Sequence, residues 1–215
     1  MNPPAAHSRR PIKTRSHPWA QQAAAWLAKT RISPNQISVA SLLFTGLGAV
    51  LVVSGPTPLG LLAGAVAIQC RLLCNLLDGM VAVEYGKQSA LGPLYNELPD
   101  RLADVVLIVA LGYAAQLPVL GWLGALAAVL TAYIRAFGGA LGLSQDFRGP
   151  LAKSQRMAVM TGGCILGAIE QALTTSTPYC LQAAILIIVL GSLLTVVLRT
   201  QAMVRQLQQS QPERG

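Results

Sequence analysis

Residues 180–199 read CLQAAILIIVLGSLLTVVLR, and only the last of them, Arg199, is charged. A helix rises about 1.5 Å per residue, so roughly twenty apolar residues cross the hydrocarbon core of a bilayer. This run therefore predicts a transmembrane helix. We predict an all-α integral membrane protein with six transmembrane helices, because five more apolar runs of similar length precede this one. They lie at 36–54, 58–77, 96–117, 118–142 and 157–174.

The composition supports the membrane assignment. Charged residues make up 11% of the 215 residues and hydrophobic residues 53%, whereas a soluble domain carries roughly 25% charged residues. The formal net charge is +8, and strongly basic chains often bind nucleic acid. Here the basic residues flank apolar runs, so we predict that they meet anionic membrane lipids and not nucleic acid.

The basic residues also predict the orientation of the chain. The breaks at 54–58, 116–118 and 174–178 contain turn-forming residues but no lysine or arginine. The alternate connections and both chain ends carry nearly all of the basic residues, and basic loops stay on the cytoplasmic side. We therefore predict a multi-pass protein of the cell membrane, the inner membrane in a bacterium, with both termini in the cytoplasm.

The two ends of the chain are predicted to differ from the middle. Residues 1–17 are predicted to be a disordered basic tail, residues 18–205 a single membrane domain, and residues 206–215 a C-terminal tail. The membrane domain opens with a short amphipathic segment, 18–29, which suits the headgroup layer of a membrane. Its apolar face comprises Trp19, Ala23, Trp26 and Leu27.

The few acidic residues are concentrated in one segment. Five of the eight lie between Asp78 and Asp104, and ionisable residues in a membrane span usually mark function. On helices, Asn75 shares a face with Asp78, and residues 96, 100 and 104 form a stripe. Facing each other, these oxygens would favour Mg²⁺, Mn²⁺ or Ca²⁺. The alternative is a buried ion network, in which the acids pair with Arg71, Arg101 and Lys87.

The same segment resembles the signature of the CDP-alcohol phosphotransferases (CDP-alcohol phosphatidyltransferases), D-x2-D-G-x2-A-R-x8-G-x3-D-x3-D. Asparagine replaces the first and third aspartates, and valine replaces the arginine. Residues 33–38 and the basic pair before the fifth span also resemble the family, so the resemblance covers roughly residues 18–200. Every spacing of the signature is kept, at Asn75, Asp78, Gly79, Ala82, Val83, Gly92, Asn96 and Asp100.

The resemblance implies a reaction and a set of roles. Members of the family transfer a substituted phosphate from a CDP-alcohol, usually CDP-diacylglycerol, to a second alcohol in phospholipid biosynthesis, and CMP leaves. Mg²⁺ or Mn²⁺ on the signature aspartates neutralises the charge that develops on the leaving phosphate. By register, Asp78 is a metal ligand and Asp100 is the general base, while Gly79, Ala82 and Gly92 line the nucleotide site. The resemblance also implies a homodimer.

The two asparagines change the expected metal site. An amide oxygen can ligate Mg²⁺ but brings no charge, so we expect either one ion or two ions in a different arrangement. Glu97 points about 100° away from Asn96 around the helix and is the weaker substitute. Asp104, a turn beyond Asp100, is expected to restore one of the lost charges. The expected ligands are therefore Asn75, Asp78, Asn96, Asp100 and Asp104.

Clustered cations are expected to bind a phosphate of the substrate, and ordinary anchoring of basic residues at the cytoplasmic face is the alternative. The cations are Arg135, Arg148, Lys153 and Arg156. Two other functions stay open. One is a catalytically silent membrane protein that binds nucleotide or lipid, and the other is a small cation or solute transporter. The acceptor alcohol is not identified by the sequence.

Overall fold

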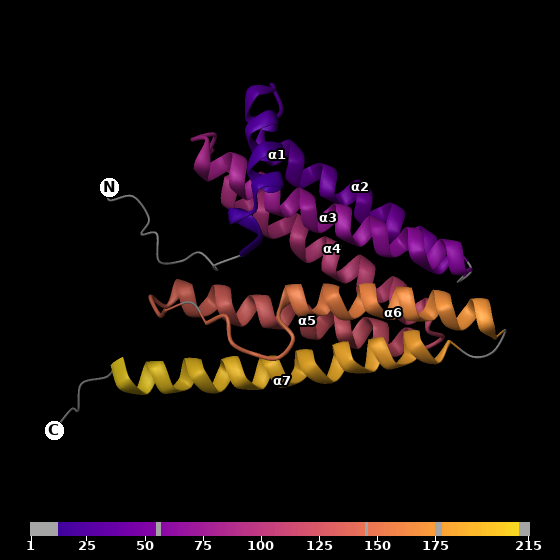
Figure 1. Ribbon diagram of the computed structural model, residues 1–215. Helices are drawn as coiled ribbons and strands as arrows, with labels where there is room; N and C mark the ends of the chain where they lie inside the picture. The colour runs from indigo at the N-terminus through magenta and orange to yellow at the C-terminus, as the bar shows by residue number, and fades with distance from the viewer. Residues whose placement is uncertain (1–12, 55–56, 145, 175–177, 211–215) are drawn as a thin grey trace.

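The computed structural model of the chain describes residues 13–54, 57–144, 146–174 and 178–210. Every regular element in these ranges is a helix (Figure 1). A short 3₁₀ helix, Lys13–Ser16, precedes α1. The α-helices are α1 (Pro18–Lys29), α2 (Pro34–Val53), α3 (Pro58–Glu84), α4 (Gly92–Ala114), α5 (Pro118–Ala140), α6 (Lys153–Leu173) and α7 (Tyr179–Ser210).

The six predicted apolar runs correspond to the helices α2 to α7, which confirms the all-helical membrane fold. Four of them, α2, α3, α5 and α7, are long and apolar enough to cross a membrane by length and composition alone. The helices α4 and α6 have 23 and 21 residues, but they carry three of the six buried charged residues of the described chain, Asp100, Asp104 and Arg156. The number of six membrane crossings therefore stays a prediction.

Proline and capping residues explain where several helices begin. A proline occupies the first turn of α1, α2, α3 and α5, where its missing amide hydrogen costs no helical hydrogen bond. Ser33 caps α2: its Oγ accepts a hydrogen bond from the Gln36 backbone N, and the Gln36 side chain accepts one from the Ser33 backbone N. This reciprocal capping box starts α2 at the segment that resembles the family.

The helices α2 to α7 form a closed ring of neighbours. Going round the ring, α2 packs on α3, α3 on α6, α6 on α7, α7 on α5, α5 on α4, and α4 on α2. Figure 1 shows α2, α3 and α4 running together above the group of α5, α6 and α7. Glycine allows the closest of these contacts, because a Cβ on Gly121 of α5 would lie 3.0 Å from the Cα of Gly112 in α4.

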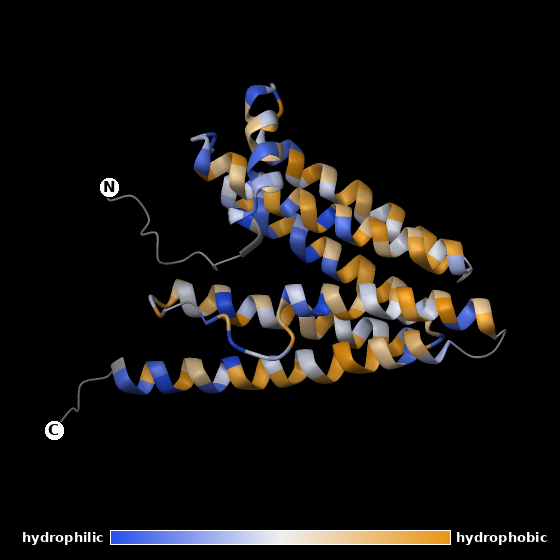
Figure 2. Cartoon of the chain, in the orientation of Figure 1, coloured by the Kyte–Doolittle hydropathy of each residue, from blue (hydrophilic) through white to orange (hydrophobic). Residues whose placement is uncertain are grey.

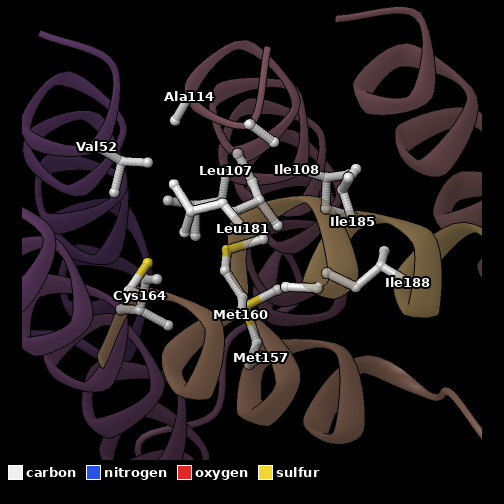
Figure 3. Packing of buried hydrophobic residues seen from close by; sticks show 14 of the residues in the cluster. Val52, Leu107, Ile108, Ala114, Met157, Met160, Cys164, Leu181, Ile185 and Ile188 are labelled. Atoms are coloured by element: carbon white, nitrogen blue, oxygen red, sulfur yellow. The ribbon is translucent and has the colours of Figure 1, made fainter. Parts of the chain in front are cut away.

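A hydrophobic core fills the centre of the ring (Figure 3). Along α4, Asp100 and Asp104 come before the first core residue, Leu107, and along α6, Lys153 comes before Met157. Asp100 and Asp104 of α4 and Lys153 of α6 are therefore gathered at one end of the core, whereas Glu170 of α6 lies near the other end. The core residues labelled in Figure 3 are Val52, Leu107, Ile108, Ala114, Met157, Met160, Cys164, Leu181, Ile185 and Ile188.

Apolar side chains also cover the outside of the bundle (Figure 2). Leu43, Leu59 and Leu173 are 75%, 78% and 79% exposed, on three different helices. Exposing apolar surface to water costs about 25 cal/mol per Å², and hydrocarbon removes that cost. The outer surface is therefore that of a multi-pass membrane protein.

Helices extend into both of the predicted tails, and the boundaries of the membrane domain stay predictions. Within the predicted tail 1–17, residues Lys13–Ser16 form a helix, and residues 1–12 lie outside the described ranges. The helix α7 continues to Ser210, past the predicted boundary at 205, because residues 200–210 contain no glycine or proline to end it.

The predicted amphipathic segment 18–29 is the helix α1. It packs on α3 through Ala20 and Ala24, which are fully buried. Trp19 and Trp26 are exposed on other sides of the helix. The small alanines allow α1 to lie close to the bundle, and the contact of the tryptophans with the headgroup layer stays a prediction.

Candidate active site

A cavity of about 650 Å³ opens beside the charged ends of α4 and α6. Its wall is built by α1, by α3 to α7 and by the loop between α5 and α6. Five cationic and two anionic side chains line it, which gives the cavity a net positive charge. These residues are Arg101, Arg135, Lys153, Arg156 and Arg199, together with Glu97 and Asp100.

Asp100 is the one aspartate of the signature region that lines this cavity. Its Oδ1 accepts a hydrogen bond from Asn75 Nδ2 at 2.7 Å, and its Oδ2 is in direct contact with the ammonium group of Lys153. Arg71 Nη2 lies 3.5 Å from Oδ1. Because a carboxylate only accepts hydrogen bonds, Asn75 presents its amide nitrogen to Asp100. Side chains from α3 and α6 thus converge on one carboxylate of α4.

Asp104 lies one turn further along α4 and does not line the cavity. Its Oδ1 accepts a hydrogen bond from Arg71 Nη2 at 3.0 Å, and its Oδ2 accepts one from Arg156 Nη2 at 2.9 Å. All three side chains are 2% exposed or less. Two guanidinium groups, from α3 and α6, therefore hold one buried carboxylate of α4.

This geometry does not support the expectation that Asp104 supplies a metal ligand. Each of its oxygens faces a guanidinium group, so a divalent ion there would lie among like charges. Asp104 instead fits the alternative of a buried ion network. Of the three partners expected in it, Arg71 pairs with Asp104, and its second partner is Arg156, not Arg101 or Lys87. The ammonium of Lys87 instead donates to the Thr30 backbone oxygen at 2.9 Å.

Asp78 lies on α3 and is only 3% exposed. Ser38 of α2 donates a 2.5 Å hydrogen bond to its Oδ2, whereas its Oδ1 is buried without a hydrogen-bond partner. Burying a carboxylate oxygen without a partner is costly. The unpartnered oxygen is therefore a place where a cation would be stabilising.

The two signature asparagines both line the cavity. Asn96 is exposed in the first turns of α4, and Asn75 is half-buried on α3. Within the part of the chain that the structure describes, no three carboxylate, imidazole or thiol groups lie close enough to hold one metal ion. An ion at this site would thus need the amide oxygens of the asparagines.

The three predicted nucleotide-binding residues lie near the loop that joins α3 to α4, outside the lining of the 650 Å³ cavity. Gly79 and Ala82 are half-buried near the end of α3, and Gly92 begins α4. A Cβ on Gly92 would meet Ser89 Oγ at 3.7 Å and no other atom within 4 Å. The space beside Gly92 is open, and the nucleotide-binding role stays a prediction.

Three of the four predicted phosphate-binding cations line the cavity. Lys153 contacts Asp100, and Arg135 Nη2 donates to both oxygens of Glu97, at 2.8 and 2.9 Å. The third, Arg156, is held by Asp104 and by backbone and hydroxyl oxygens, and its role in phosphate binding stays a prediction. Arg148 does not line the cavity; it is exposed and pairs with Asp146 at 3.0 Å.

Sequence patterns did not indicate three residues that shape the site. Ser38 binds Asp78, and its position inside the 33–38 segment that resembles the family was the available signal. Arg199 donates to the Thr131 backbone oxygen at 2.7 Å, and both residues line the cavity. No sequence pattern around Arg199 or Thr131 indicates a role in the site. An arginine at the end of a span resembles an ordinary cytoplasmic anchor.

The sequence profile of the CDP-alcohol phosphatidyltransferases matches residues 31–204, which include α2 to α6 and most of α7. The chain belongs to this family. It is therefore a membrane transferase that moves a phosphatidyl group from a CDP-alcohol in phospholipid biosynthesis. This confirms the enzyme class that the signature spacing predicts.

Two curated relatives match parts of the chain. The chain is 27% identical over 135 residues to the inner membrane protein YnbA of Escherichia coli, across 62% of this chain and 67% of that protein. It is 35% identical over 153 residues to the bifunctional IPC transferase and DIPP synthase of Rubrobacter xylanophilus, across 68% of this chain. The matched part is 34% of the bifunctional enzyme.

Solved structures of the phosphatidylinositol phosphate synthase of Mycobacterium tuberculosis have the same fold. The structure in complex with manganese and citrate has a TM-score of 0.72 at 19% identity, across 90% of this chain and 92% of that chain. The structure with CDP-DAG bound has a TM-score of 0.70 at 20% identity, across 86% and 92%. The helix arrangement is therefore shared despite the low identity.

Proposed function

We propose that this enzyme transfers the phosphatidyl group of CDP-diacylglycerol to a phosphorylated alcohol, with Asp100 as the general base. The proposal rests on the position of the Asp100 carboxylate, which lies in the wall of a cation-rich cavity. A general base must lie within hydrogen-bond reach of the proton that it removes, and about 650 Å³ is a usual volume for a small-molecule site. Asp78 and Asp104 do not line this cavity.

The proposed reaction is a substitution at phosphorus. The acceptor hydroxyl oxygen bonds to the phosphorus that carries the diacylglycerol, the bond from that phosphorus to CMP breaks, and Asp100 takes the hydroxyl proton. CDP-diacylglycerol as the donor is supported by the Mycobacterium tuberculosis structure that contains it. Part of the cavity wall is apolar and suits its acyl chains, namely Trp19, Leu72, Leu73 and Leu76.

The residues near the cavity fit Mg²⁺ or Mn²⁺. The unpartnered Oδ1 of Asp78 and the amide oxygens of Asn75 and Asn96 are hard ligands, and such ligands favour these ions. When bound, the ion neutralises negative charge on the donor pyrophosphate as CMP leaves. We propose Asp78 as the anionic ligand and the two asparagines as neutral ligands.

The charges of the cavity support an acceptor that carries a phosphate. After Glu97 and Asp100 are counted, the five cations of the lining leave an excess of positive charge. Of these five cations, Arg156 pairs with Asp104 outside the lining, whereas Lys153 and Arg135 pair with the two carboxylates of the lining, Asp100 and Glu97. A phosphate on the acceptor would balance this excess.

The test is CMP release by the purified protein with CDP-diacylglycerol, Mg²⁺ or Mn²⁺, and a panel of acceptors. We expect release with inositol phosphate or glycerol phosphate, and little release with inositol, glycerol or serine. Release with only the unphosphorylated acceptors would contradict the proposed acceptor class. Absence of release with every acceptor would favour a catalytically silent binder, and cation flux in proteoliposomes would favour a transporter.

Gly79→Leu is expected to abolish binding of CDP-diacylglycerol while the protein stays folded. A leucine beside Asp78 would fill the space through which the nucleotide reaches the backbone of α3. Binding can be measured with radiolabelled donor in detergent. The matched control is Gly46→Leu on α2, where an added Cβ meets nothing within 4 Å. Equal affinity of both variants for the donor would place the nucleotide elsewhere.

We propose that both termini and the α3–α4 loop are cytoplasmic, because the breaks at 54–58, 116–118 and 174–178 contain no lysine or arginine. Single cysteines at Ser54 and Gln88, both exposed, would report the two sides of the membrane. The background replaces the four native cysteines. A membrane-impermeant thiol reagent added to intact cells should label position 54 and leave position 88 unlabelled. The reverse pattern would invert the orientation.

A further inference from the structure

Both oxygens of Asp100 are occupied by groups of this chain. The Asn75 amide nitrogen donates to Oδ1 at 2.7 Å, and the Lys153 ammonium contacts Oδ2. The contact with Asn75 requires an amide, because a carboxylate at position 75 would face the Asp100 carboxylate at the same separation and be repelled. The replacement of aspartate by Asn75 and the Lys153 contact are thus parts of one local arrangement.

Asp78 differs from Asp100 in this respect. The residue is only 3% exposed, and its Oδ1 is buried without a hydrogen bond of full geometry. Besides Ser38, the backbone N–H of Gly79 is beside the carboxylate. None of the ion pairs in the described part of the chain involves Asp78. Of the carboxylates near the cavity, Asp78 therefore has the strongest need for a cation from outside the chain.

We propose that this chain holds a single divalent ion, on Asp78, and that the Lys153 ammonium takes the place of a second cation on Asp100. This inference concerns the same site as the proposed function. It rests on that function, because the proposed reaction is what requires a metal ion. A lysine ammonium is a compact point charge, so it can neutralise one carboxylate as an ion would. Lys153 is then a positioning residue, which orients Asp100 through the contact with Oδ2.

The number of negative charges supports one ion. Asp104 is neutralised by two arginines, Asp100 is paired with Lys153, and the signature positions 75 and 96 are neutral amides. Only Asp78 remains to balance a divalent ion. A second ion would add two positive charges beside Arg71 and Lys153 with no further carboxylate to offset them.

The test counts Mn²⁺ bound to the purified full-length protein, without nucleotide, by the electron paramagnetic resonance signal of free Mn²⁺. We expect one ion per wild-type chain. Asp78→Asn should weaken its binding at least tenfold, since an amide still accepts from Ser38 but carries no charge. Glu170→Gln is the control and should bind as the wild type does, because Glu170 lies at the opposite end of α6 and accepts from the Cys180 backbone N.

Two further variants test the role of Lys153. Asn75→Asp alone should still bind one ion, because the Lys153 ammonium then offsets the carboxylates at positions 75 and 100. Asn75→Asp with Lys153→Met should bind two, because two facing carboxylates have lost their ammonium. Two ions in the wild type or in Asn75→Asp, or one ion in the double variant, would overturn the proposal. Retained helicity and a monodisperse elution profile show that each variant is folded.

The ion assignment and the proposed function can be contradicted independently of each other. The Mn²⁺ measurement uses no donor and no acceptor, so it stands whether or not CMP is released. One ion per chain with no CMP release would support the ion assignment and contradict the proposed function. CMP release by a wild-type chain that holds two ions would support the function and overturn the assignment.

Discussion

Asp100→Asn is expected to lower the rate of CMP release by about 100-fold to 10,000-fold, the usual contribution of a general base. An amide has the shape of the carboxylate but takes no proton from the acceptor hydroxyl. The rate is measured with saturating CDP-diacylglycerol and acceptor. Binding of the donor should change little, because the substitution removes no atom from the cavity wall.

Glu97→Gln is the matched control for this measurement. Glu97 also lines the cavity and also loses one negative charge, but its oxygens are engaged by Arg135. We expect its maximal rate to stay within about tenfold of the wild type, with the main change in the acceptor concentration needed for half-maximal rate. Equal loss of rate in both variants would show that cavity charge, and not proton removal by Asp100, matters for catalysis.

Asp104→Asn is expected to lower the free energy of unfolding by about 3–5 kcal/mol, which is typical when one partner of a buried ion pair is removed. The amide nitrogen cannot accept a hydrogen bond, so one of the two guanidinium groups of Arg71 and Arg156 is left buried and uncompensated. The measurement is denaturation in mixed detergent micelles, followed by helicity.

Asp146→Asn is the control, because it makes the same substitution beside an arginine whose side chain is 71% exposed. The expected change there is about 0–1 kcal/mol. The Mn²⁺ concentration for half-maximal activity should be the same in Asp104→Asn and in the wild type. A stable Asp104→Asn protein that needs ten times more Mn²⁺ would restore Asp104 as a metal ligand and remove the structural role given to it above.

Local patterns predicted the membrane class, the helices and the family. An apolar run such as 180–199 has one stable arrangement in a bilayer, because a helix satisfies all of its own backbone hydrogen bonds. The spacing from Asn75 to Asp100 identified the family, because both halves of the signature lie on neighbouring helices joined by a short loop. The last residues of α7, up to Ser210, were not predicted as helix, since residues 200–210 carry no long apolar run.

Only the tertiary structure decided which partner each charged residue has. The place of Asp104 on the stripe of α4 predicts a metal ligand, yet its oxygens are occupied by Arg71 and Arg156, which are 33 and 52 residues away in the chain. The order of helices in the ring likewise brings Lys153 of α6 to Asp100 of α4 and leaves one oxygen of Asp78 unpartnered. Helical periodicity states which residues share a face of one helix. It does not state which other helix packs on that face, since this depends on the fit of side chains between helices distant in the chain.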